Sequence, residues 1–139
     1  MLKHFIFGLL FLCGSFAFGQ QNVSLNVEIA GIKSEKGKIL FSLFADKNGF
    51  PGDMTKAIKK GSVYIENGMA IIDLNLPPGE YAIMVFHDED DNNELKTNFI
   101  GMPREGVGNS NNHKGIPSYK KSVFKLTKNK TITINLWYV

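Results

Sequence analysis

Cysteine is almost absent from this chain, with only Cys13 among 139 residues. A single cysteine excludes a disulfide scaffold and any structural zinc site built on cysteines. An excess of one charge is also lacking, because 16 Lys and Arg are balanced by 13 Asp and Glu. No basic run with interleaved aromatic residues occurs, so the sequence gives no indication of nucleic-acid binding.

Amphipathic segments of helical length, internal repeats and low-complexity stretches are missing as well. The hydrophobic content is 43%, eleven residues are Phe, and only 21% are charged. This is too much apolar mass for a disordered chain. The length is that of one ordinary globular domain.

Residues 1–19 have the pattern of a secretory signal peptide. Lys3 and His4 precede an apolar stretch over residues 5–18, and Ala17-Phe18-Gly19 presents small residues at a cleavage site. The stretch is shorter than the roughly 20 residues of a membrane-spanning helix. A lipoprotein signal is disfavoured because Leu12, not a small residue, precedes Cys13. We therefore expect an exported domain at 20–139, periplasmic or extracellular, with no cysteine and a net charge of +2 once Lys3 is removed.

The remainder has the two-residue periodicity of β-strands. Seven strands are predicted: 23–29, 38–46, 62–66, 69–76, 81–87, 122–126 and 131–139. Leu40 and Phe44 add a second apolar face to the second strand, which predicts burial on both faces. Asn67-Gly68 predicts a hairpin between the third and fourth strands, and Lys128-Asn129 a closing pair. The pattern favours an antiparallel β-sandwich of immunoglobulin-like or transthyretin-like type, with a closed barrel as the alternative.

The stretch from Asp88 to Lys121 is predicted to be one long ordered loop of 34 residues, rich in Gly and Asn. Asp88, Asp90 and Asn92 place oxygen ligands at alternate positions, as in the first half of an EF-hand. Phe99 stands where the bidentate Glu would be, so Glu105 and Asn112 would have to complete a calcium site. The alternative is a solvated acidic turn whose side chains cap the local backbone.

His87 and His113 are the only histidines after residue 19. Together with Glu105 they could form a zinc site, but their spacing does not support one. A His87 that holds the loop in shape through hydrogen bonds is the favoured interpretation. An enzymatic alternative remains, a small hydrolase or metal-dependent enzyme that uses His87, Asp88, Glu105 and His113.

Several motifs resemble a secreted bacterial family known as a domain of unknown function, DUF 2141. They are a Pro-Gly-x-Tyr-Ala turn, His-Asp-x-Asp, Leu-x-Thr-Asn, Gly-x-Pro-x-Glu and Ser-Asn-Asn. Their residues are Pro78, Gly79, Tyr81, Ala82, His87, Asp88, Asp90, Leu95, Thr97, Asn98, Gly101, Pro103, Glu105, Ser110, Asn111 and Asn112. The chain departs from the family pattern at Asn93-Glu94, where members carry Asn-Gly, so Asn93 would have to adopt the left-handed conformation. The resemblance implies export and a β-sandwich-like fold, and it implies no activity.

Three functions follow as hypotheses. The leading one is a non-enzymatic binding or envelope-associated module, whose polar loop is organised by Ca²⁺ and binds a glycan, a peptide or an envelope component. The second is the enzyme described above. The third is a purely structural envelope protein, in which the loop only holds two sheets together.

Overall fold

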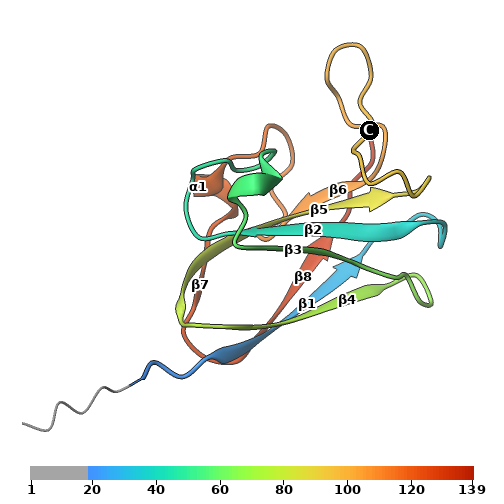
Figure 1. Cartoon of the computed structure of the whole chain (residues 1–139). Helices are drawn as coiled ribbons and strands as arrows, with labels where there is room; N and C mark the ends of the chain where they lie inside the picture. The colour runs from blue at the N-terminus through green and yellow to red at the C-terminus, as the bar shows by residue number, and fades with distance from the viewer. Residues whose placement is uncertain (1–18) are drawn as a thin grey trace, which may run out of the picture.

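The computed structural model describes residues 19–139, so the predicted signal peptide lies outside the described residues except for Gly19. Within this range the fold is almost entirely β (Figure 1). The elements are β1 (Val23–Ala30), β2 (Lys38–Phe44), η1 (Met54–Lys56), β3 (Lys59–Val63), β4 (Ala70–Leu76), β5 (Gly79–Asp88), β6 (Val107–Asn109), α1 (Tyr119–Ser122), β7 (Phe124–Leu126) and β8 (Lys130–Asn135). No helix in this part of the chain is both long and apolar enough to cross a membrane.

Two sheets pack face to face, which confirms the predicted all-β sandwich. One sheet has the order β4-β1-β8, and the other has the order β3-β2-β5-β6 with β7 added along β5. Alternation along β1 buries Leu25, Val27 and Ile29 between the sheets. Ile83 and Val85 of β5 meet them from the opposite sheet. Most strand pairs are antiparallel, but β1 and β8 are parallel.

Strand β2 is buried on both faces, as its sequence predicts. Its inner residues enter the core, and its outer face is covered by the connection between β2 and β3 and by α1. Phe44 makes an edge-to-face contact with Phe50 at a centroid distance of 5.3 Å, and Phe50 makes another with Tyr119 at 6.0 Å. Figure 1 shows η1 and α1 on the side of β2 and β5 that faces away from β1. The five-stranded sheet therefore has an outer layer built from connections.

Two predicted strand pairings are wrong. Asn67 and Gly68 do form the expected turn, with φ of 53° and 76°. However, only a single bridge, Glu66 to Met69, follows it, because the chain crosses here from β3 in one sheet to β4 in the other. The predicted closing pair also separates, since β7 joins β5 and β8 joins β1.

The predicted long loop is interrupted by β6, which brings the described strands to eight instead of seven. β6 pairs with β5 from Met84 to Phe86, and Val107 forms a bridge with Trp137. The short strand divides the loop into two parts that both lie near the outer face of the sheet. Its position determines the geometry of the candidate site.

Candidate functional site

The acidic turn, residues 88–94, begins where β5 ends. Asp88 is fully buried, and its two carboxylate oxygens accept the backbone N–H groups of Asn92 at 3.1 Å and Asn93 at 2.9 Å. Asp91 and Asn93 take left-handed φ values of 59° and 63°, so Asn93 has the conformation that the turn was expected to require of it. The carboxylate at the strand end therefore determines the shape of the turn.

Glu105 connects the acidic turn to the segment that follows it. Its side chain is buried, and its two oxygens accept the backbone N–H groups of Glu89 at 3.2 Å and Lys96 at 3.1 Å. Hydrogen bonds to an ionised acceptor are among the stronger ones in proteins. Each buried carboxylate of the site thus has two backbone donors, which offset the cost of its burial.

Asp90 is the exposed member of the cluster. Its carboxylate forms an ion pair with Lys96, and the hydrogen bond from Lys96 holds the pKa of Asp90 below its usual value. The same pair raises the pKa of Lys96. The Asn92 side-chain amide also donates to Asp90, at 3.2 Å. Asp90 therefore already has a cationic partner within the chain.

Ligand oxygens of Asp88, Asp90 and Glu105 lie within 4.8 Å of one another. Among residues 19–139 this is the only group of three or more acidic, His or Cys side chains close enough to share an ion. Three of the five predicted calcium ligands thus come together, and Asn92 contacts the cluster through Asp90. The fifth, Asn112, is engaged elsewhere: its amide donates to Thr133 O at 2.9 Å and accepts from Asn135 N at 2.7 Å.

The neighbouring chain fits closely around the acidic turn. Lys38 of β2 pairs with Asp91 at 2.6 Å, and this hydrogen bond raises the pKa of Lys38. Gly37 has a φ of +71°, and a β-carbon at this position would lie 1.8 Å from the Asp88 carbonyl oxygen. Only glycine can occupy this position without a shift of the backbone.

His87 points to the other side of β5 and is fully buried. Its Nε2 lies 2.7 Å from Lys36 O, and because a carbonyl can only accept, Nε2 carries a proton. Nδ1 lies 2.9 Å from the Tyr138 hydroxyl, which itself accepts from Lys33 N. Burial raises the pKa of Tyr138, so this hydroxyl stays protonated. His87 therefore links three distant segments of the chain.

The asparagine run, residues 109–112, joins the two sheets. Asn111 donates to the carbonyls of Lys121 and Val123, while Asn112 bonds to β8. The Ser110 hydroxyl donates to the Ser122 carbonyl and accepts from Ile83 N, so both of its hydrogen bonds are buried. These bonds hold the run against the backbone of both sheets.

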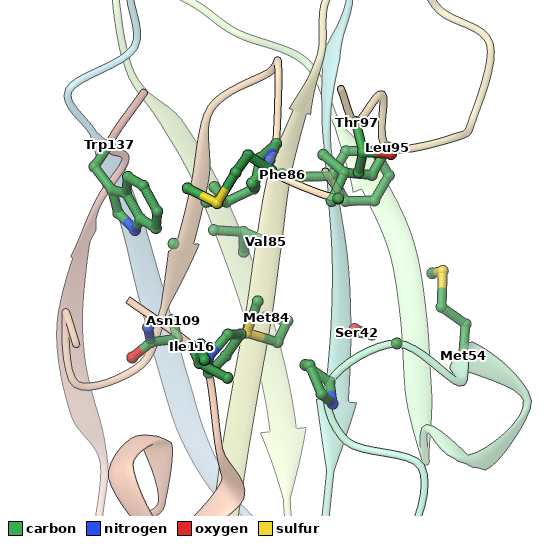
Figure 2. Close-up of a pocket in the computed structure, with 18 of the residues that line it drawn as sticks. Ser42, Met54, Met84, Val85, Phe86, Leu95, Thr97, Asn109, Ile116 and Trp137 are labelled. Atoms are coloured by element: carbon green, nitrogen blue, oxygen red, sulfur yellow. The ribbon is translucent and has the colours of Figure 1, made fainter. Parts of the chain in front are cut away.

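An open cavity lies beside the asparagine run, and sequence reasoning missed it. It is about 640 Å³ in volume and lies over β2, β5 and β6 on the outer face of the sheet. Figure 2 shows Ile116 and Trp137 on one side of β5, with Met54 and Leu95 on the other. We call this space the outer cavity.

The lining of the outer cavity is mostly apolar with a few polar groups. The apolar members include Met54, Met84, Phe86, Leu95, Met102, Ile116 and Trp137. The polar members include Ser42, Thr97, Asn109 and His113. A concave apolar surface with few polar groups is the usual character of a small-molecule site. The only sequence feature that pointed to this cavity was the second apolar face of β2, because a strand buried on both faces needs an outer layer to cover it.

The two histidines are not neighbours in one centre. His113 lines the outer cavity, whereas His87 bonds Lys36 and Tyr138 from the inner face of β5. The enzymatic alternative requires both to converge with Asp88 and Glu105, and neither belongs to the carboxylate group.

Comparison with known proteins identifies the family. A family model described as "Uncharacterized protein conserved in bacteria (DUF2141)" matches residues 27–135. No curated protein and no solved structure matches the chain. The matched range runs from within β1 to the end of β8, so it includes the acidic turn and the lining of the outer cavity apart from Trp137. The chain therefore belongs to the DUF2141 family, an uncharacterised family of bacterial proteins.

Proposed function

We propose that this domain is an exported, non-enzymatic binding module, and that the outer cavity holds its ligand. The observation that carries the proposal is the cavity itself. Its volume, about 640 Å³, falls in the range of roughly 300–1,000 Å³ that is typical of small-molecule sites. Strands β2, β5 and β6 form its floor. Its walls come from the long loop, from the connection between β2 and β3, and from Trp137.

The chemistry of the lining indicates a ligand that is apolar over most of its surface. Three methionines, Met54, Met84 and Met102, contribute flexible and polarisable side chains that adapt to different apolar shapes. Asn109 and His113 add polar atoms on the same lining. A predominantly apolar molecule with one polar end matches this distribution.

Trp137 gives the experiment an internal probe, because it is the only tryptophan of the chain and lines the cavity. Titration with the amphiphilic dye 1-anilinonaphthalene-8-sulfonate should change Trp137 fluorescence and saturate at one site. Ser42→Phe should abolish saturable binding, because Ser42 is buried and lines the cavity. Ile71→Phe is the matched control, since Ile71 is half exposed on β4 of the other sheet. Equal dye binding by both variants would contradict the proposal.

We further propose that Ca²⁺ organises the acidic turn, with Asp88, Asp90, Asn92 and Glu105 as ligands. The convergence of three carboxylates supports it, although Lys96 must then give up its contact with Asp90. Calorimetry with Ca²⁺, together with melting temperatures in Ca²⁺ and in chelator, tests it. A ligand at 100 times its Kd stabilises the fold by about 2.7 kcal/mol. No heat and no change in melting temperature would refute it.

Export and association with the cell envelope complete the proposal. The pattern of residues 1–19 supports export. Fractionation of a bacterial host should recover a chain that begins near Gln20 outside the cytoplasm, with N-terminal sequencing as the readout. Recovery of only the intact chain in the cytoplasm would contradict it.

A further inference from the structure

The long loop forms a projecting finger, residues 96–104, beyond the acidic turn. Arg104 N donates to Lys96 O at 2.7 Å, and Thr97 and Pro103 form a bridge above this pair. Figure 1 shows this segment extending away from both sheets. The finger is therefore a hairpin that is closed at its base by backbone hydrogen bonds.

Asn98 holds the tip of the finger in shape. Its side-chain oxygen accepts the backbone N–H groups of Ile100 at 3.0 Å and Met102 at 2.9 Å. Its backbone bonds Met102 O and Gly101 N as well, and Gly101 takes a φ of +83°. The tip is thus ordered by its own hydrogen bonds before it meets any partner.

This ordered tip presents large apolar side chains to solvent. Phe99 is 97% exposed and Ile100 is 68% exposed, although both are adjacent in sequence and strongly apolar. Across the outer cavity, Ile116 is 88% exposed on the segment 113–121. The adjacent exposure of Phe99 and Ile100 is the kind of apolar patch that marks an interaction surface.

Every charged residue within the finger and the segment 113–121 is basic, whereas the acidic turn and Glu105 border the base of the finger. Apart from Lys96, which pairs with Asp90, the two segments carry Arg104, Lys114, Lys120 and Lys121. The nearby acidic turn is partly neutralised, because Asp90 pairs with Lys96 and Asp91 with Lys38. Apolar tips with basic flanks complement an anionic lipid surface.

The small apolar area of the tip favours a bilayer over a protein as its partner. A stable protein interface needs about 800 Å² from each side. A buried aromatic side chain contributes roughly 150–250 Å², so Phe99 and the two smaller side chains of Ile100 and Ile116 do not reach this area by themselves. A bilayer needs only that the tip enters it. We propose that the finger and Ile116 insert into the surface of a bilayer that contains anionic lipid, independently of what the outer cavity binds.

Co-sedimentation with vesicles tests the proposal. The vesicles are phosphatidylcholine alone and phosphatidylcholine with phosphatidylglycerol at 3:1. The wild type should partition several-fold better into the anionic vesicles. Phe99→Ser combined with Ile100→Ser should lower this partition at least tenfold, which corresponds to 1.4 kcal/mol. The matched control, Tyr64→Ser combined with Ile71→Ser, removes two other exposed apolar side chains and should stay within twofold of the wild type.

All variants share the apolar stretch 5–18, so a difference between them reports on the finger alone. Equal partition of the wild type into both vesicle types, or no effect of the finger variant, would overturn the proposal. A shift of the finger variant to a smaller oligomer in light scattering would also overturn it, because the tip would then serve self-association.

A spectroscopic readout tests insertion directly. Phe99→Trp in a Trp137→Phe background places the only tryptophan at the tip. Its emission should shift to shorter wavelength with anionic vesicles and be quenched by brominated lipid. An unchanged spectrum at saturating vesicle concentration would overturn the proposal. These vesicle results are separate from the dye titration, so either proposal can fail alone.

Discussion

Replacement of Glu105 by Ala should destabilise the fold and loosen the finger. The buried carboxylate accepts two backbone N–H groups, at 3.2 and 3.1 Å, from Glu89 and Lys96. A hydrogen bond to a charged group contributes about 1.5–3 kcal/mol. Because Glu89 and Lys96 are otherwise exposed, water can replace part of this loss. We therefore expect a decrease of about 2–4 kcal/mol in the free energy of unfolding.

Urea denaturation at pH 7 measures this change as a lower midpoint with an unchanged slope. Glu105→Gln should recover little, because its amide nitrogen would face one of the two N–H donors. Glu94→Ala is the matched control, since Glu94 is exposed in the same turn, and it should stay within about 0.5 kcal/mol of the wild type. Hydrogen exchange should also show faster exchange over residues 96–104 in Glu105→Ala. If Glu105→Ala has the stability of the control, the carboxylate does not hold the loop and the reasoning fails.

Three further predictions concern the same region. Gly37→Ala should lower the unfolding free energy by more than about 2 kcal/mol, because its β-carbon would overlap the Asp88 carbonyl, and a thermal melt that matches the wild type would contradict this. Because the native pKa of Asp90 is lowered, its contribution to stability is present above the unfolded-state pKa near 3.8 and is lost as the pH falls through the native pKa. Urea midpoints from pH 6 to 2 should therefore fall less steeply in Asp90→Asn, and identical pH profiles would count against the pair with Lys96. Ser110→Ala leaves two buried backbone groups without partners and should cost about 2 kcal/mol in urea denaturation, whereas a neutral result would require another donor and acceptor at this place.

Local sequence signals correctly predicted most strands, but they did not predict which strands pair with one another. Asn67 and Gly68 form the expected turn because both tolerate positive φ. A turn does not determine which sheet the next strand joins. Here β4 pairs with β1 in the opposite sheet and not with β3. β6 was missed because a three-residue segment centred on Gly108 has no periodicity. Its strand conformation comes from pairing with Met84–Phe86 and with Trp137.

The candidate site was predictable to a similar degree. The alternation of Asp88 and Asp90 correctly indicated neighbouring oxygens, because their spacing is local. Glu105 joins them only because the finger returns to its own base, and the spacing of these residues in the sequence does not determine that return. The outer cavity is formed by contacts among four segments that are distant in the sequence, so almost no local sequence pattern predicts it.

The parallel pairing of β1 with β8 has a consequence for how the chain reaches its native state. β1 lies between β4 and β8, so its central position exists only when residues 130–135 are available. Pairing across more than 100 residues also makes the closure of the sheet a late and slow event. No fragment that ends before Lys130 can complete this sheet. Completion of the three-stranded sheet therefore requires nearly the whole domain, from Val23 to Asn135.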